Sequence, residues 1–199
     1  PIVGIDNPIV LSYLDVLRDR KPVGKRVAII GAGGIGFDVA EFLAEEDSLT
    51  NKPEEWLKEW GIDKSYQQGG ALSANHSHTK SEREIHLMQR KTTKVGAGLG
   101  KTTGWIHRST LKNQGVNMIP GVEYSKIEDN NLLFIVNGKE QKLELDNIIV
   151  CAGQTPNRAL YEQLIDQNQS AHLIGGADVA AELDAKRAIR QGAELAARI

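Results

Sequence analysis

Cysteine is nearly absent from this sequence, with Cys151 the single thiol among 199 residues. One thiol cannot form an intramolecular disulfide, and it cannot supply the four thiolates that an iron–sulfur cluster usually requires. Aromatic residues make up only 5% of the chain, and no basic stripe is interleaved with them, which argues against a nucleic-acid partner. The net charge is only -2, so any recognition of charge must be local.

Long apolar runs are also missing, so neither a secretory signal nor a membrane segment is expected. The sequence starts with Pro1 rather than Met, and we expect it to be part of a longer protein. Together with the single cysteine, these features predict a reducing, cytoplasmic location. The hydrophobic share of 40% suffices for the core of an ordinary soluble domain.

A strand, a glycine-rich turn and a helix follow one another near the N-terminus. RVAII at 26–30 is a run without polar alternation, typical of a strand buried on both faces of a parallel sheet. The next residues have G-x-G-x-x-G spacing and lead into an amphipathic helix, which predicts an α/β fold with a Rossmann-type dinucleotide-binding domain. The backbone and helix N-terminus would bind the pyrophosphate. The residues expected there are Gly31, Ala32, Gly33, Gly34, Ile35 and Gly36.

The rest of the chain extends this α/β pattern. Further buried strands are predicted at 84–91, 116–119 and 147–153, and helices within 10–20, at 102–115 and at 184–199. Three alternating segments, 122–129, 132–138 and 142–146, predict a small antiparallel meander. Residues 45–83 are a polar insertion with one short helix around Trp56 and Trp60.

A second glycine-rich stretch, VGAGLGKTTGW at 95–105, offers a rival phosphate site. A P-loop requires glycine, four residues and then Gly-Lys-Ser/Thr, and here Val95 stands where the first glycine belongs. Neither LLFIVNG at 132–138 nor NIIVCAG at 147–153 ends in the Asp that would position magnesium. We therefore expect a mobile loop beside the adenosine end of the dinucleotide, with Lys101 as a further phosphate contact.

The strand at 84–91 indicates which dinucleotide binds. Arg90 and Lys91 stand where an NAD site usually has Asp or Glu, Lys94 follows, and residues 85–122 contain no acidic side chain. Cationic side chains at this place can pair with the 2′-phosphate of NADP(H). The alternative is that Arg90 and Lys91 are solvated charges at the end of a strand.

Longer stretches resemble one family along essentially the whole chain. They are AIIGAGGIGFDVA, EWGID, GLGKTTGWIHR, MIPGVEYSKI, CAGQTPNRAL and HLIGGADVAAELDAKRAIRQG. Together they resemble the bacterial NADPH-dependent 2,4-dienoyl-CoA reductases, which are flavoproteins of fatty acid β-oxidation with an iron–sulfur centre. The resemblance implies the C-terminal part of such an enzyme, without the N-terminal barrel that carries FMN, the 4Fe-4S cluster and the substrate site.

The same resemblance implies a partial FAD site. DNIIVCAGQTPNRAL resembles the passage from the nicotinamide domain back to the FAD domain in such flavoproteins, with Ala152 and Gly153 near the cofactor. HLIGGADVA resembles their late FAD motif, which implies contacts from Gly176 and Asp178. An alanine separates this Gly-Asp pair, so which glycine acts is left open.

The final helix would direct its N-terminus, near Asp184, at the flavin ring. The alternative for Asp178 and Asp184 is plain helix capping. The implied domains are a remnant of an FAD-binding domain at 1–21, an NADP-binding domain at 22–154, and a further part of the FAD-binding domain at 155–199.

The expected role is entry of electrons from NADPH through FAD, and no catalytic residue is assigned to this chain. Three alternatives remain open: a related NAD(P)H-dependent flavin reductase with another substrate, a non-catalytic adenine-nucleotide-binding module, and a P-loop NTPase. His76 and His78 lie in a polar loop without Cys or carboxylate support, so no metal site is predicted. Cys151 is expected to be a buried structural thiol.

Overall fold

The structure, a computed structural model, describes residues 2–45, 47–73, 78–181 and 185–199. The chain folds into two compact units, Pro1–Ala152 and Gly153–Ile199. The division falls two residues before the predicted start of a C-terminal domain at 155. Residues 1–21 belong to the first unit, and their assignment to an FAD-binding domain stays a prediction.

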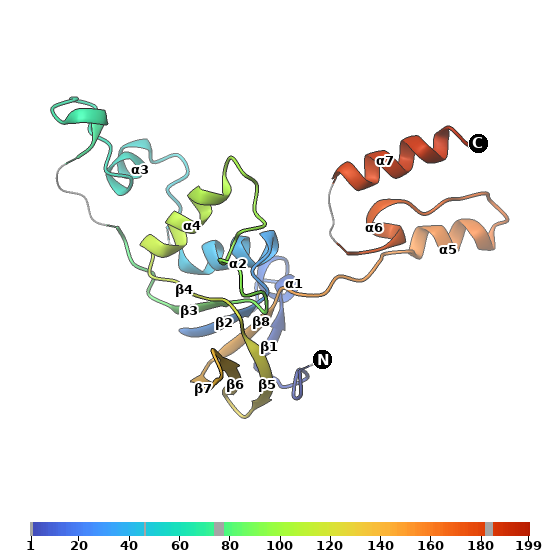
Figure 1. Cartoon of the computed structure of the whole chain (residues 1–199), viewed down its shortest axis with the longest axis horizontal. Coiled ribbons are helices and arrows are strands. Elements are labelled where there is room, and N and C mark those ends of the chain that lie inside the picture. Colours follow the sequence, from blue (N-terminus) through green and yellow to red (C-terminus); the bar gives the residue numbers. More distant parts are fainter. Residues whose placement is uncertain (1, 46, 74–77, 182–184) are drawn as a thin grey trace. The chain divides into compact units, whose positions relative to one another are not determined.

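A parallel sheet of five strands forms the centre of the first unit, in the order β1-β8-β2-β3-β4 (Figure 1). The strands are β1 (Val10–Ser12), β2 (Arg26–Ile30), β3 (Glu84–Met88), β4 (Asn117–Ile119) and β8 (Asn147–Val150). β2 pairs with β3 on one side and with β8 on the other, both in parallel. The α/β class predicted from the sequence is therefore confirmed.

Two apolar clusters cover the two faces of this sheet. On one face Val27 and Ile29 pack with side chains of α1 (Tyr13–Leu17), α2 (Gly34–Ala44) and α4 (Gly104–Asn113). On the other face Ala28 and Ile30 pack against the meander. Consecutive residues of β2 thus point to opposite buried faces, which explains why this strand shows no polar alternation.

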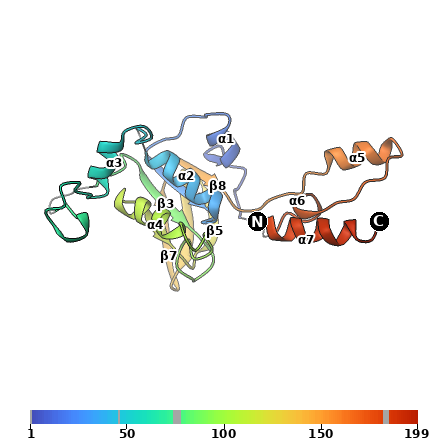
Figure 2. The same ribbon diagram turned by 90° about the horizontal axis from the view of Figure 1, so that it is seen from above.

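The meander comprises β5 (Glu123–Glu128), β6 (Asn131–Val136) and β7 (Lys139–Glu144), paired antiparallel as predicted. Its buried side chains include Ile127, Leu132 and Phe134. Figure 2 shows the sheet and helices from above, with the insertion helix α3 (Pro53–Glu59) beyond the end of α2. A 3-10 turn, η1 (Gly69–Ala71), follows α3 within the insertion.

The helix predicted within 10–20 is present as α1, but the residues before it form a strand that was not predicted. Val10 and Leu11 form β1 and pair in parallel with Ile148 and Ile149 of β8. The helix α1 begins only at Tyr13, after a capping box in which Ser12 and Asp15 cap each other's backbone N–H groups. The apolar side chains at helical spacing therefore belong first to the strand β1 and then to the helix α1.

The second unit contains α5 (Ala159–Asp166), α6 (Gly175–Asp178) and α7 (Ala185–Ala196). The final helix was predicted, whereas α5 was not. Large apolar side chains are exposed on this unit: Leu160 at 68%, Ile189 at 71% and Val179 at 50%. Among its described residues only Gly175 is buried, so the unit forms no apolar core of its own. None of the described helices is long and apolar enough to cross a membrane.

Candidate dinucleotide-binding site

The turn after β2 has the backbone geometry that the glycine spacing predicts. Gly31 has a φ of +110°, a conformation that side chains strongly disfavour, and its N–H donates to Met88 O at 2.9 Å. A Cβ added to Gly36 would lie 1.8 Å from Gly31 O. The turn and the first turn of α2 are therefore in backbone contact, which only glycine at position 36 allows.

Gly33 and Gly34 differ from these two positions because they face open space. A Cβ added to either residue would meet no atom within 4 Å. Gly33 is the N-cap of α2, and no side chain caps the N–H groups at this end of the helix. Free N–H groups and the positive end of the helix dipole are what phosphate binding requires. The residues here thus leave a space and present donors that fit a pyrophosphate.

The turn lies where the order of the strands reverses. The chain runs from β2 outward through β3 to β4, and returns to the other side of β2 as β8. Cys151 N–H donates to Ile30 O at 2.8 Å, and a Cβ at Gly31 would approach Cys151 C to 2.9 Å. Ala152 is therefore next to the glycine turn. In open α/β sheets, ligands bind outside the carboxyl ends of the strands at such a reversal.

Cys151 is 9% exposed, and burial raises the pKa of its thiol to about 12. It is thus the structural thiol that the sequence predicted, with no reactive thiolate at neutral pH.

The segment after β3 presents four exposed cations, Arg90, Lys91, Lys94 and Lys101. Within the described part of the chain, none of them forms a salt bridge. Arg90 lies within electrostatic reach of Tyr124, whose hydroxyl is buried without a hydrogen-bond partner among the described residues; burial raises the pKa of this hydroxyl. The carboxyl end of β3 is therefore basic, as predicted.

The loop at 95–103, which was expected to be mobile, contacts the domain at several points. Val95 is 3% exposed, and Gly96 O accepts a hydrogen bond of 2.9 Å from Arg108 Nη1. A Cβ at Gly96, whose φ is +75°, would approach the Phe37 ring to 2.7 Å. Six residues separate the end of β3 from this loop, whereas a P-loop follows directly after a strand. Sequence reasoning assigned no role to Arg108, which the structure identifies as the anchor of this loop.

The neighbouring residues of α4 have different surroundings. His107 Nδ1 lies 2.8 Å from Glu41 Oε1 and thereby connects α4 to α2. Trp105 is 54% exposed. Its surroundings assign it no part in the site.

Of the described residues expected at FAD, Ala152 ends the first unit, and Gly153, Gly176 and Asp178 belong to the second. Gly153 opens this unit with a φ of +85°, and Gly176 and Asp178 lie in α6. Arg158 donates to the carbonyl oxygens of Ala177 and Asp178 at 3.1 and 2.6 Å. These contacts connect Arg158, the N-cap of α5, to α6. Asp184 lies outside the described residues, as does His76.

His78 is described, and its Nδ1 lies 3.2 Å from Glu59 Oε1. Among the described residues, no group of three or more His, Cys, Asp or Glu side chains could hold a metal ion.

The fold and the glycine turn define the first unit as a Rossmann-type dinucleotide-binding domain. The chain belongs to the pyridine nucleotide-disulphide oxidoreductase family, whose sequence pattern matches residues 9–177. Membership of this family implies binding of FAD and NAD(P)H.

Known relatives are much longer than this chain. A metal reductase of Desulforamulus reducens is 25% identical over 188 residues, which cover 89% of this chain and 26% of the relative. A cinnamate reductase of Clostridium sporogenes is 27% identical over 177 residues, covering 89% and 21%. The solved structure of a 2-naphthoyl-CoA reductase complex superimposes with a TM-score of 0.67 at 20% identity, over 96% of this chain and 24% of that one. The chain thus spans about a quarter of their length.

Proposed function

We propose that this chain is the NADPH-entry part of a flavin-dependent reductase. The observation that carries the proposal is the glycine turn at the reversal of the sheet together with four exposed cations after the next strand. NADPH, when bound, would supply a hydride to FAD and leave as NADP⁺. The chain's own residues would bind and orient the nucleotide and leave the chemistry to the cofactors.

The two ends of the dinucleotide would bind to different features of the first unit. Gly33, Gly34 and the N-terminus of α2 would hold the pyrophosphate. Arg90 and Lys91 would pair with the 2′-phosphate, and Lys101 would reach it from the loop that Arg108 anchors. No carboxylate stands at the end of β3 to accept the ribose hydroxyls of NAD. The arrangement therefore favours NADPH over NADH.

The second unit would contribute only part of an FAD site. Its exposed apolar side chains on α5 and α7 fit a surface that normally packs against the remainder of an FAD-binding domain. Gly153, Gly176 and Asp178 would meet FAD there. Ala152 and Asp184 are the further FAD contacts that the resemblance implies. We expect the remainder of that domain from the longer protein, as in relatives about four times the length of this chain.

The substrate we propose is a 2,4-dienoyl-CoA. This follows from the resemblance of six long stretches to the 2,4-dienoyl-CoA reductases. The cinnamate reductase is a relative whose name also refers to an unsaturated acid. In the longer protein, a barrel with FMN and a 4Fe-4S cluster would pass the electrons to this substrate. The second candidate is a flavin reductase for another substrate, which the metal reductase favours.

The test compares the purified chain with the full-length protein. The chain should be colourless, and NADPH with hexa-2,4-dienoyl-CoA should give no turnover, because most of the FAD site is elsewhere. The full-length protein should show flavin absorbance and consume NADPH with the dienoyl-CoA in preference to cinnamate or Fe³⁺. Stoichiometric flavin in the chain, or a preference of the full-length protein for another acceptor, would contradict the proposal.

A further inference from the structure

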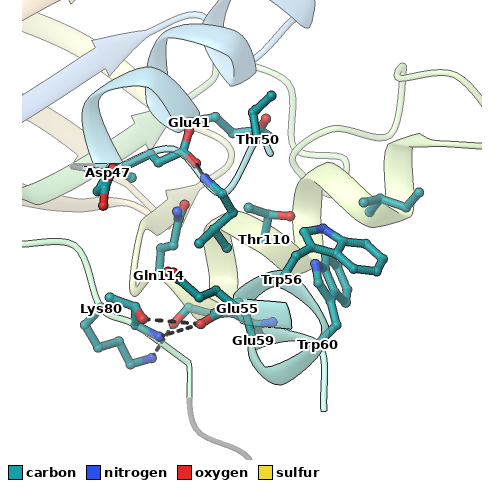
Figure 3. Close-up of a pocket in the computed structure, with 16 residues that line it drawn as sticks. Glu41, Asp47, Thr50, Glu55, Trp56, Glu59, Trp60, Lys80, Thr110 and Gln114 are labelled. Atoms are coloured by element: carbon teal, nitrogen blue, oxygen red, sulfur yellow. Dashed lines mark hydrogen bonds between the residues drawn. The ribbon is translucent and has the colours of Figure 1, made fainter. Parts of the chain in front are cut away.

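A cavity of about 670 Å³ lies between the insertion and the C-terminal ends of α2 and α4 (Figure 3). This volume is within the range of small-molecule sites. The glycine turn lies at the opposite end of α2, a helix of 11 residues that spans roughly 16 Å. The cavity is therefore separate from the dinucleotide site, and the function proposed above does not use it.

Carboxylates dominate the charged groups that line this cavity. They are Glu41, Glu45, Asp47, Glu55 and Glu59, against the single ammonium group of Lys80. Lys80 Nζ already donates to Asn113 O at 2.7 Å, at the end of α4. Asp47 is already paired with Lys52, and this hydrogen bond is the main reason why the pKa of Lys52 is raised, with a smaller contribution from Glu55. Glu55 itself has no ion-pair or hydrogen-bond partner among the described residues. The cavity therefore has an excess of negative charge.

Two helix ends add to this negative potential. Glu45 and Gln114 are the C-caps of α2 and α4, and both line the cavity. The C-terminal end of a helix is the negative end of its dipole and stabilises cations. The Gln114 side-chain oxygen is moreover buried without a hydrogen-bond donor among the described residues. An N–H group entering the cavity would satisfy this acceptor.

Aromatic surface completes the lining. Trp56 and Trp60 lie with their ring centroids 6.1 Å apart at an interplanar angle of 42°, and Trp56 is 45% exposed. Indole faces attract ammonium groups and also contact methylene chains. Figure 3 shows Glu41 and Asp47 at one side of the cavity, and Glu55, Glu59 and the two tryptophans at the other. Carboxylates on both sides suit a ligand with more than one positive charge.

We propose that this cavity binds an aliphatic organic cation with two or more ammonium groups, with Trp56, Glu55 and Gln114 as principal contacts. Its ammonium groups would pair with the carboxylates of α3 and of the segment after α2. The methylene chain between them would cover the Trp56 ring. The site would thus connect the polar insertion to the Rossmann core.

Spermidine is the probe for this proposal. In a Trp105→Phe background, whose remaining tryptophans are Trp56 and Trp60, spermidine should change the emission saturably, with half-saturation below about 1 mM. Trp56→Leu, followed by calorimetry, should weaken binding at least about fivefold, and Glu55→Gln about threefold or more. The matched control is Glu54→Gln on the same helix, which should stay within about twofold, because Glu54 pairs with Lys64 away from this cavity.

Circular dichroism melting of each variant checks that it is folded, and Glu55 is exposed, so its substitution should not affect folding. A response that stays linear to about 10 mM spermidine would overturn the proposal. So would equal losses in Glu54→Gln and Glu55→Gln, or displacement of spermidine by Mg²⁺ at equal ionic strength. Each of the last two outcomes would indicate general attraction to an acidic surface rather than a site for an organic cation.

Discussion

Substitutions at two glycines of one turn should separate cofactor binding from stability. Gly33→Val places its side chain where a Cβ meets no atom within 4 Å, at a φ of -84° that Val readily adopts. We expect a loss of about 1 kcal/mol or less in the free energy of unfolding, from the changed N-cap. The added isopropyl group fills the space that the pyrophosphate needs, so NADPH affinity should fall by more than about tenfold.

Gly36→Ala should have the opposite effect, because it should lower the stability of the fold more than it lowers NADPH affinity. Its Cβ would lie 1.8 Å from Gly31 O, a backbone atom that cannot rotate away. Overpacking of this kind costs about 1–3 kcal/mol, and the better helix propensity of Ala offsets up to about 1 kcal/mol. Because the contact is with backbone, we expect a net loss of about 2 kcal/mol in the free energy of unfolding.

Urea unfolding and calorimetric titration with NADPH measure the two effects separately. The reasoning is refuted if Gly33→Val destabilises the chain as much as Gly36→Ala. It is equally refuted if Gly33→Val binds NADPH like the unsubstituted chain. The second result would place the pyrophosphate away from this turn.

Two further predictions concern Asp146 and Lys101. Asp146 accepts hydrogen bonds from Arg26 Nη2 and from the N–H groups of Lys25 and Arg26, which lower its pKa to about 2. A lowered pKa stabilises the fold above the unfolded value near 4, and this stability is lost as the pH falls from about 4 to 2. Asp146→Asn should therefore lower Tm at pH 7, and a Tm difference that persists unchanged at pH 2 would contradict this. The unsubstituted chain should not hydrolyse ATP with Mg²⁺; hydrolysis that Lys101→Ala abolishes would support the P-loop alternative.

Sequence patterns predicted the centre of the fold because they reflect burial on both faces. β2 is apolar from Val27 to Ile30 because these residues alternate between the helices and the meander. The spacing of Gly31, Gly33 and Gly36 reflects backbone contact and open space, and both require glycine at fixed positions of the sequence. These features are local, so a single sequence reveals them.

The features that the sequence did not predict depend on contacts between residues far apart in the chain. β1 exists because β8 offers an edge for pairing, and nothing within 10–20 indicates this partner. Arg108 anchors a residue 12 positions earlier, an interaction that neither helical nor strand periodicity encodes. The cavity between α2, α3 and α4 likewise brings together residues from 41 to 114. The FAD contacts of the second unit stay a proposal, because its described residues form no apolar core that could position them.

Calorimetric titration of the chain with NADPH and NADH tests the central claim most directly. Charge-assisted contacts of Arg90 and Lys91 with the 2′-phosphate should each contribute on the order of 1.5–3 kcal/mol, so NADPH should bind at least about tenfold more tightly. Arg90→Ala should remove most of this preference, whereas Lys139→Ala, at an exposed lysine of β7, should retain it. Equal affinities for the two nucleotides, or an Arg90→Ala variant that keeps the full preference, would contradict the account.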